Sequence, residues 1–247
     1  MRFANCAVVL LVGLGAFAAK PLSAEEIIAK HVVARGGLDK LRAIQSLRRE
    51  GHLVYPESNM EMRIVEVVQR PARIRTDVTM QGLTSIDAFD GKEGWRVSPF
   101  GGRKDPEKLS ADETKSMALE ADLDFPFVDA KAKGHTLEAL GLEDVEGTPA
   151  YKLRVSLKSG DQLTVFIDPD SFMLIRVVTR QFVRGAEQEW ETDYGEYERV
   201  AGVWMPMVLE SGGKGSESSH KSKVVYDRVE ANVQVDEKRF AFPEVKP

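Results

Sequence analysis

The sequence predicts a mainly β protein of the α+β class, built on an antiparallel sheet. Apolar residues alternate with polar ones over many short runs, which is the period of a strand with one buried face. Turn-forming pairs such as Gln81-Gly82 and Asp90-Gly91 separate the runs, and connections this short join antiparallel neighbours. Helical patterns are confined to the N-terminal part and to residues 101–135. Because no linker divides the chain, residues 25–247 are expected to form a single domain.

The first 24 residues are predicted to be a cleavable secretory signal peptide. Arg2 precedes the apolar run Ala7 to Ala19, which is too short to span a bilayer. Small residues allow cleavage after Ala24 or near Ala18-Ala19, and the pattern favours Ala24. The only cysteine, Cys6, lies before the apolar run, so no disulfide is expected in the mature protein.

Charge excludes two classes of partner. The full chain carries a formal net charge of −5, and removal of Arg2 and Lys20 with the leader would make it −7. An acidic chain without basic runs is not expected to bind nucleic acid or to dock electrostatically on anionic membranes. The remaining 223 of 247 residues are enough to bury a core.

Two short helices are predicted at the start of the mature chain. Residues 25–35 carry an apolar stripe and end at Gly36-Gly37. Ser23 and Glu26 have the spacing of a capping box, although cleavage after Ala24 would remove this cap. Asp39 can cap a second helix that extends to about Gln45.

Five strands are predicted next, and the second of them, residues 60–70, ends in Arg70. Met60, Met62, Ile64 and Val68 share one face of their run, and the same phase places Arg70 on that face. A cation at the end of an apolar face is costly unless it has hydrogen-bond partners. The five predicted strands are residues 46–55, 60–70, 73–81, 84–89 and 94–98.

Residues 101–135 interrupt the strand pattern. Gly101-Gly102 is predicted to open a loop, and Ser110 with Glu113 forms a capping box for a helix over 111–123. Acidic and aromatic residues alternate after this helix, and a second short helix is expected at 128–133.

The second half returns to strands. A flexible hairpin tip is predicted at 212–216. Residues 232–247 are expected to be irregular, with Phe240 and Phe242 inserted into the core. The predicted strands begin with the alternating run 151–157 and continue with 163–167, 174–180, 188–200, 204–210 and 221–229.

Catalytic and cofactor motifs are absent from the sequence, so we expect neither an enzyme nor a bound cofactor. The chain lacks a nucleophile elbow, a zinc-protease motif, a phosphate-binding loop and a dinucleotide fingerprint. The histidines have no metal-ligand spacing and are interpreted as structural or surface residues: His31, His52, His135 and His220. An enzyme acting on lipids or cell-wall material is the less favoured alternative, with Asp90, Asp122, Asp124 and His135 as its acids and bases.

Two motifs resemble those of the LolA/LolB-like family of periplasmic lipoprotein carriers. They are Gln69-Arg70-Pro71-Ala72-Arg73-Ile74-Arg75 and Asp90-Gly91-Lys92-Glu93-Gly94-Trp95. The resemblance implies a strongly curved, unclosed β-barrel whose open side is covered by N-terminal and inserted helices. It also implies an apolar cavity that binds the acyl chains of a lipoprotein or lipid in the periplasm. An inner-membrane export complex and an outer-membrane acceptor are the partners it implies.

In this resemblance Arg70 matches the family's gating arginine, which donates hydrogen bonds to carbonyl groups of the lid. Residues 111–123 are then the lid candidate, and an ordinary strand-end arginine is the alternative interpretation. A sensor or interaction module with the same fold is the second functional hypothesis. The other candidate cavity residues, which could instead fill a packed core, are Met60, Met62, Ile64, Ile74, Val78, Met80, Trp95, Tyr151, Leu153, Met205 and Met207.

Overall fold

The computed structural model describes residues 20–183 and 185–243, which form a sheet with helices on its concave side. The predicted signal peptide therefore lies largely outside the described residues. The strands are β1 (Ser46–Tyr55), β2 (Met60–Gln69), β3 (Arg73–Met80), β4 (Leu83–Phe89), β5 (Gly94–Ser98), β6 (Arg103–Lys108), β7 (Thr136–Val145), β8 (Thr148–Ser156), β9 (Gln162–Ile167), β10 (Leu174–Val183), β11 (Ala186–Val200), β12 (Val203–Gly213) and β13 (Ser222–Ala231).

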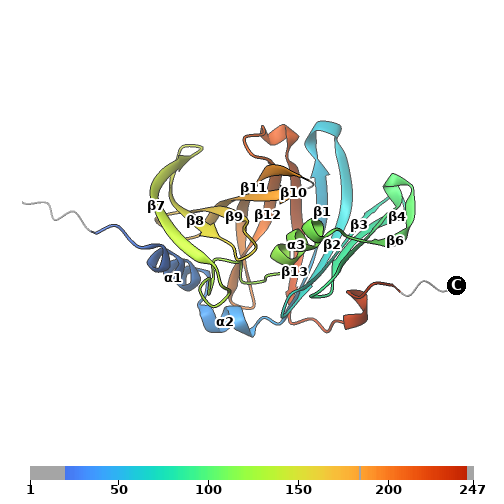
Figure 1. Cartoon of the computed structure of the whole chain (residues 1–247), viewed down its shortest axis with the longest axis horizontal. Coiled ribbons are helices and arrows are strands. Elements are labelled where there is room, and N and C mark those ends of the chain that lie inside the picture. Colours follow the sequence, from blue (N-terminus) through green and yellow to red (C-terminus); the bar gives the residue numbers. More distant parts are fainter. Residues whose placement is uncertain (1–19, 184, 244–247) are drawn as a thin grey trace, which may run out of the picture.

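All thirteen of these strands belong to one antiparallel sheet, in the order β6-β5-β4-β3-β2-β1-β13-β12-β11-β10-β9-β8-β7. The two halves of the chain meet where β1 pairs with β13, the last strand. Within the described residues no ladder joins β6 to β7, so the curved sheet is an unclosed barrel (Figure 1). The predicted mainly β fold class is confirmed.

A glycine allows β1 and β13 to approach closely at this junction. The register shifts between Glu50 and Gly51, which is the signature of a β-bulge. A Cβ atom on Gly51 would lie 1.9 Å from the carbonyl oxygen of Val225. Only a residue without a side chain fits here, so the continuity of the sheet depends on Gly51.

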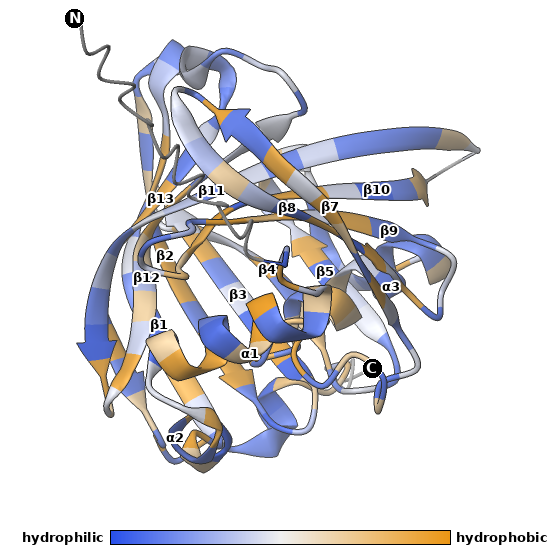
Figure 2. Ribbon diagram, turned by 90° about the vertical axis from the view of Figure 1, so that its left-hand side faces the viewer, coloured by the Kyte–Doolittle hydropathy of each residue, from blue (hydrophilic) through white to orange (hydrophobic). Residues whose placement is uncertain are grey.

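Three α-helices cover the concave side: α1 (Ala24–Arg35), α2 (Leu38–Ala43) and α3 (Ala111–Glu120). Both predicted capping boxes are present, Ser23 with Glu26 on α1 and Ser110 with Glu113 on α3. Helix α1 packs between β7 and β12, whereas α3 contacts β3, β4, β5 and β10 across the barrel (Figures 1 and 2). Short 3-10 helices lie at Pro56–Ser58, Pro99–Gly101, Ser218–His220 and Glu237–Arg239.

The inserted helix is shorter than the sequence pattern predicts. It ends at Glu120 rather than at residue 123, and residues 128–133 form turns instead of a helix. Phe125 and Asp129 both have positive φ angles, which a continuing right-handed helix cannot contain. The predicted second helix also ends early, because α2 stops at Ala43.

Two strands were not predicted, and both lie at an edge of the sheet. Apart from Pro106, every residue of strand β6 is charged. Charged residues and proline suit an edge strand, and they also weaken the sequence pattern by which a strand is recognised. Strand β7 is interrupted by an irregularity between Ala139 and Gly141. The hairpin tip after β12 is also shorter than predicted, since Gly212 and Gly213 belong to the strand.

The core is divided between the two halves of the barrel. In the second half, Ile27 and Ile28 of α1 pack with Phe127 and with the concave side chains of β8, β9 and β10. In the first half, Met117 of α3 contacts a cluster that includes Ile74. A third cluster packs α2 against β1 and β12. The helices are therefore held at both sides of the barrel.

The C-terminal segment covers the convex face near β5. Trp95 is paired with Ala88 and lies on the face opposite to Ile74. Its indole nitrogen donates a hydrogen bond of 2.7 Å to the carbonyl oxygen of Phe240, and the ring of Phe242 packs edge-on. Phe240 is fully buried, as predicted, but against Trp95 beneath the convex face, and Phe242 is only half-buried.

Candidate functional site

The concave side of the sheet encloses a cavity of about 790 Å³ beneath α2, α3 and the segment that follows α3. Its wall is formed by β1–β3, β5 and β9–β13. Most of the lining side chains are apolar: Leu41, Ile44, Leu47, Ile64, Ile74, Leu119, Leu123, Phe125, Pro126, Phe127, Leu163, Val177, Met205, Pro206, Leu209, Val224 and Val229. This volume is typical of small-molecule binding sites.

Polarity changes along the length of the cavity. Near α2 the wall is formed by a tight apolar cluster that includes Leu41, Ile44 and Met205. Toward the hairpin between β10 and β11 it is lined by Gln181, Gln188 and the half-exposed Trp190. The cavity combines apolar and polar lining and can therefore accommodate an amphiphilic molecule.

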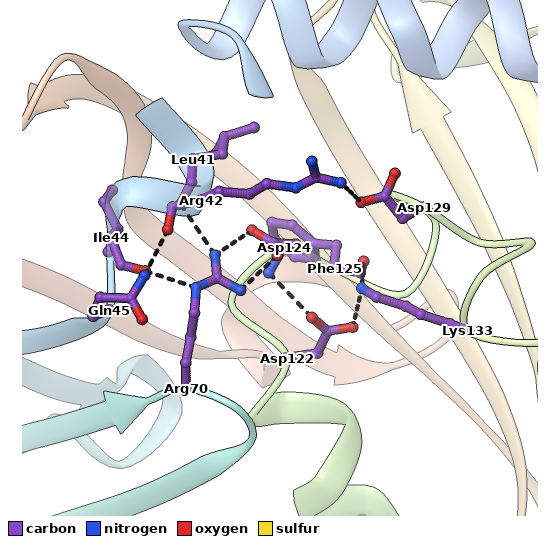
Figure 3. A network of polar contacts seen from close by, with 10 residues as sticks. All are labelled: Leu41, Arg42, Ile44, Gln45, Arg70, Asp122, Asp124, Phe125, Asp129 and Lys133. Carbon is purple, nitrogen blue, oxygen red and sulfur yellow. Dashed lines mark hydrogen bonds and ion pairs between the residues drawn. The ribbon is translucent and has the colours of Figure 1, made fainter. Parts of the chain in front are cut away.

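Arg70 connects the sheet to the end of α2 and to the segment that follows α3 (Figure 3). Its Nε donates to the carbonyl oxygen of Ile44 at 2.7 Å, and Nη2 donates to that of Leu41 at 3.0 Å. Nη1 and Nη2 also donate to the two carboxylate oxygens of Asp124, at 2.6 and 2.7 Å. We call these contacts the Arg70 network.

The Arg70 network holds the end of α2 and the segment after α3 against the sheet. Hydrogen bonding to Asp124 is the main cause of the raised pKa of Arg70. The carbonyl groups of Leu41 and Ile44 lie at the C-terminal end of α2, where the helix dipole favours a cation. The polar partners expected for this cation from the strand phase are therefore present.

We define the lid as residues 111–127, which comprise α3 and the segment that follows it. Lys115 forms an ion pair of 2.9 Å with Asp161, which attaches α3 to the second half of the barrel. At the other end of the lid, Asp122 contacts Lys133 at 2.5 Å. Polar contacts at both ends of the lid thus keep it across the cavity, a place consistent with the predicted lid over 111–123.

The lumen also contains charged groups that the sequence interpretation did not single out. Arg49 and Glu66 form an ion pair of 3.2 Å in the wall, and the Arg49 guanidinium lies over the ring of Tyr226. Glu120, the last residue of α3, also lines the cavity. The Glu120 side chain is exposed to the cavity, but desolvation by the surrounding protein and the charges of Glu66 and Asp87 raise its pKa to about 7. The cavity therefore offers ionisable groups as well as apolar contacts.

A sequence signal for one of these groups existed. Glu66 lies between Ile64 and Val68 in the same period-two phase, and β2 does place it on the concave face. Arg35, the last residue of α1, also lines the cavity and is buried. It carries no such signal, because its burial results from the way α1 packs against β12.

Four of the predicted site residues line the cavity: Ile64, Arg70, Ile74 and Met205. Trp95 does not, since it lies on the convex face beneath the C-terminal segment. Tyr151 and Leu153 belong to the packed core beneath α1. The other predicted residues lie outside the cavity wall: Met60, Met62, Val78, Met80 and Met207.

The acids and the histidine of the enzyme alternative have structural contacts. Asp90 accepts hydrogen bonds from the backbone N–H groups of Lys92 and Glu93, which closes a turn. His135 accepts one from the backbone N–H of Lys158. Asp122 and Asp124 belong to the contacts of the lid described above. In the described residues, no group of three or more His, Cys, Asp or Glu side chains could hold a metal ion.

Comparisons with known proteins identify the fold. No protein-family profile and no curated protein matches the sequence. Among solved structures, a DUF1329 family protein from Desulfovibrio piger matches with a TM-score of 0.58 at 10% identity, over 88% of this chain and 97% of that one.

Two further structures match at similar levels. A putative outer membrane lipoprotein-sorting protein domain from Vibrio parahaemolyticus gives a TM-score of 0.55 at 11% identity, covering 87% of this chain and 94% of that one. A LolA superfamily protein from Nitrosomonas europaea gives 0.56 at 12% identity, covering 90% and 98%. The chain thus has a LolA-like fold, as the two motifs predicted. None of the helices within residues 20–183 and 185–243 is both long and apolar enough to cross a bilayer.

Proposed function

We propose that this protein is a periplasmic carrier that binds the acyl chains of a lipoprotein or lipid for transfer toward the outer membrane. The observation that carries this proposal is the largely apolar cavity of about 790 Å³ beneath the lid. Each methylene that leaves water for such a site contributes about 0.8 kcal/mol. Acyl chains can therefore bind tightly without a specific pattern of hydrogen bonds.

The Arg70 network supports a protein that releases its ligand rather than one that binds it permanently. Arg70 joins the sheet to α2 and to the lid through side-chain contacts that can break without unfolding a strand. Cargo that enters the cavity would separate Asp124 from Arg70, and loss of the cargo would allow the network to form again. In this proposal binding and release require a change at one residue cluster instead of the whole fold.

Export and partners complete the proposal. The N-terminal segment predicted to be a signal peptide would be removed on export, and the domain that follows it forms the mature carrier. Ser23 caps α1 and Leu22 contacts the core, so cleavage near Ala18-Ala19 would keep contacts that cleavage after Ala24 would remove. An inner-membrane export complex would supply the cargo and an outer-membrane acceptor would receive it, with no catalytic step.

The experiment is native mass spectrometry of protein purified from the periplasm without detergent, followed by extraction and identification of lipids. A stoichiometric acyl species would support the carrier and identify its class of cargo. Protein that carries no lipid and also takes up no fluorescent acyl probe would refute it. The interaction module would then be tested by pulldown of a stable protein partner.

A further inference from the structure

One of the four arginines that line the cavity lacks a carboxylate partner. Three of them form ion pairs: Arg49 with Glu66, Arg70 with Asp124, and Arg96 with Asp87. Arg35 forms none with any residue of the described ranges 20–183 and 185–243. A guanidinium remains charged at all physiological pH values, so this difference leaves one cation in the wall uncompensated.

Arg35 is also deeply buried. It is the last residue of α1 and is only 4% exposed. Its Nε donates to the carbonyl oxygen of Trp204 at 3.2 Å, whereas Nη1 is buried without a hydrogen-bond partner. A guanidinium has five N–H donors, and in the described structure Arg35 uses one of them.

The surroundings of Arg35 compensate its charge only in part. The guanidinium carbon lies 5.5 Å from the centre of the Phe125 ring, a cation–π contact that satisfies no N–H group. The carboxylate of Asp124 stabilises its charge from a distance, but that carboxylate is bound to Arg70. Burial consequently lowers the pKa of Arg35, because a buried charge without a partner is costly.

We propose that Arg35 binds the anionic head group, a carboxylate or a phosphate, of an amphiphile whose chain occupies the cavity. This inference rests on the proposed function, because it uses the same cavity. Two oxygens of either group match the fork of N–H donors that Arg35 leaves unused. The head group would then lie inside the protein, at the α1 side of the lumen.

Phe125 couples this site to the lid. It directly follows Asp124 in the chain, and its ring lies over the Arg35 guanidinium. Separation of Asp124 from Arg70 would free the segment that holds this ring. Entry of the anion would therefore accompany opening of the Arg70 network, and the anion would replace the contact with Phe125.

The test compares cis-parinaric acid with its methyl ester, two fluorescent probes of equal chain length that differ in head-group charge. At pH 8 the acid is expected to bind about tenfold to a hundredfold more tightly, the range for hydrogen bonds to a charged group. Arg35→Gln should abolish this preference while the affinity for the ester stays unchanged. Arg63→Gln, which removes an exposed arginine on the opposite face of β2, should retain it.

The outcomes separate the two proposals. Equal affinity of the wild-type protein for acid and ester would overturn the anion site and leave the carrier intact. A preference that survives in Arg35→Gln would overturn it too. If neither probe binds, the anion site fails, and the carrier fails with it when the purified protein also carries no lipid.

Displacement of the bound acid by dodecyl phosphate and by dodecanoate then identifies the head-group class. The competitor that binds with the higher affinity shows whether the site prefers a phosphate or a carboxylate. Because Arg35→Gln removes a buried side chain, its fold is checked by circular dichroism. If it does not fold, the wild-type comparison of acid with ester still decides.

Discussion

Breaking the Arg70 network should speed the entry of acyl chains. In Asp124→Asn one carboxylate oxygen becomes an amide nitrogen, so the paired contacts of 2.6 and 2.7 Å with Arg70 cannot both remain. The two side chains are only 21% and 13% exposed, and coupling between contacting groups of this kind is about 0.5–3 kcal/mol. A loss of about 2 kcal/mol corresponds to roughly a 30-fold larger open population.

Stopped-flow fluorescence with an acyl probe measures this effect directly. If lid opening limits entry, the association rate of Asp124→Asn should rise by about the same factor of 30. The free energy of unfolding should fall by no more than the lost coupling, because the core beneath α1 does not include Asp124. Arg70→Gln should have a similar effect, and the double variant should add little to either single change.

A neighbouring ion pair provides the matched control. Arg42 and Asp129 contact each other at 2.7 Å beside the Arg70 network, but their side chains are 57% and 42% exposed (Figure 3). Exposed pairs contribute about 0–1 kcal/mol, so Asp129→Asn should change the rate less than about fivefold. An unchanged rate in Asp124→Asn, or an equal acceleration in Asp129→Asn, would refute the gating role.

Three further predictions concern stability, each measured by urea unfolding. The pKa of Glu120 is raised to about 7, so folding takes up a proton and the free energy of unfolding falls as pH rises from about 4.5 to 7. Glu120→Gln should therefore be more stable than wild type at about pH 8 and equal to it at about pH 4. Burial lowers the pKa of His31 to about 3, so stability should fall as pH drops from 6.5 toward 3, and His31→Gln should flatten that slope. Gly51→Ala should cost about 3 kcal/mol or more, whereas Gly195→Ala, where nothing lies near the added Cβ, should stay within about 0.5 kcal/mol; equal effects would contradict the bulge argument.

Local patterns were sufficient to predict most of the sheet. Runs with one buried face became strands close to their predicted bounds, since alternation reports burial of one face directly. The edge strands β6 and β7 escaped prediction because an edge has fewer neighbours and tolerates charge, proline and irregular register. Pairing of β1 with β13 joins the ends of the domain, and no local pattern encodes such a contact.

The site was predictable only where strand phase determines it. Arg70 was identified because it continues the apolar face of β2, and that face does line the cavity. Trp95 was predicted to line the cavity but lies on the convex face, because alternation along its strand shows which residues share a face but not which face is concave. The partners of Arg70, namely Asp124 and two carbonyl groups of α2, come from other parts of the chain. Their positions depend on tertiary packing, which a pattern along one strand does not contain.

The distribution of charge helps to explain why the cluster beneath α1 is packed whereas the cavity beneath α2 and α3 is open. Beneath α1, Ile27, Ile28 and Phe127 meet a face of aliphatic side chains, and close packing there brings apolar groups together. In the cavity, collapse of the wall around the Arg49–Glu66 pair would remove ionised groups from any polar medium. Desolvation of ions costs several kcal/mol each, which exceeds the gain from closing a few apolar contacts. The charged groups in the wall therefore help to keep the cavity available for a ligand.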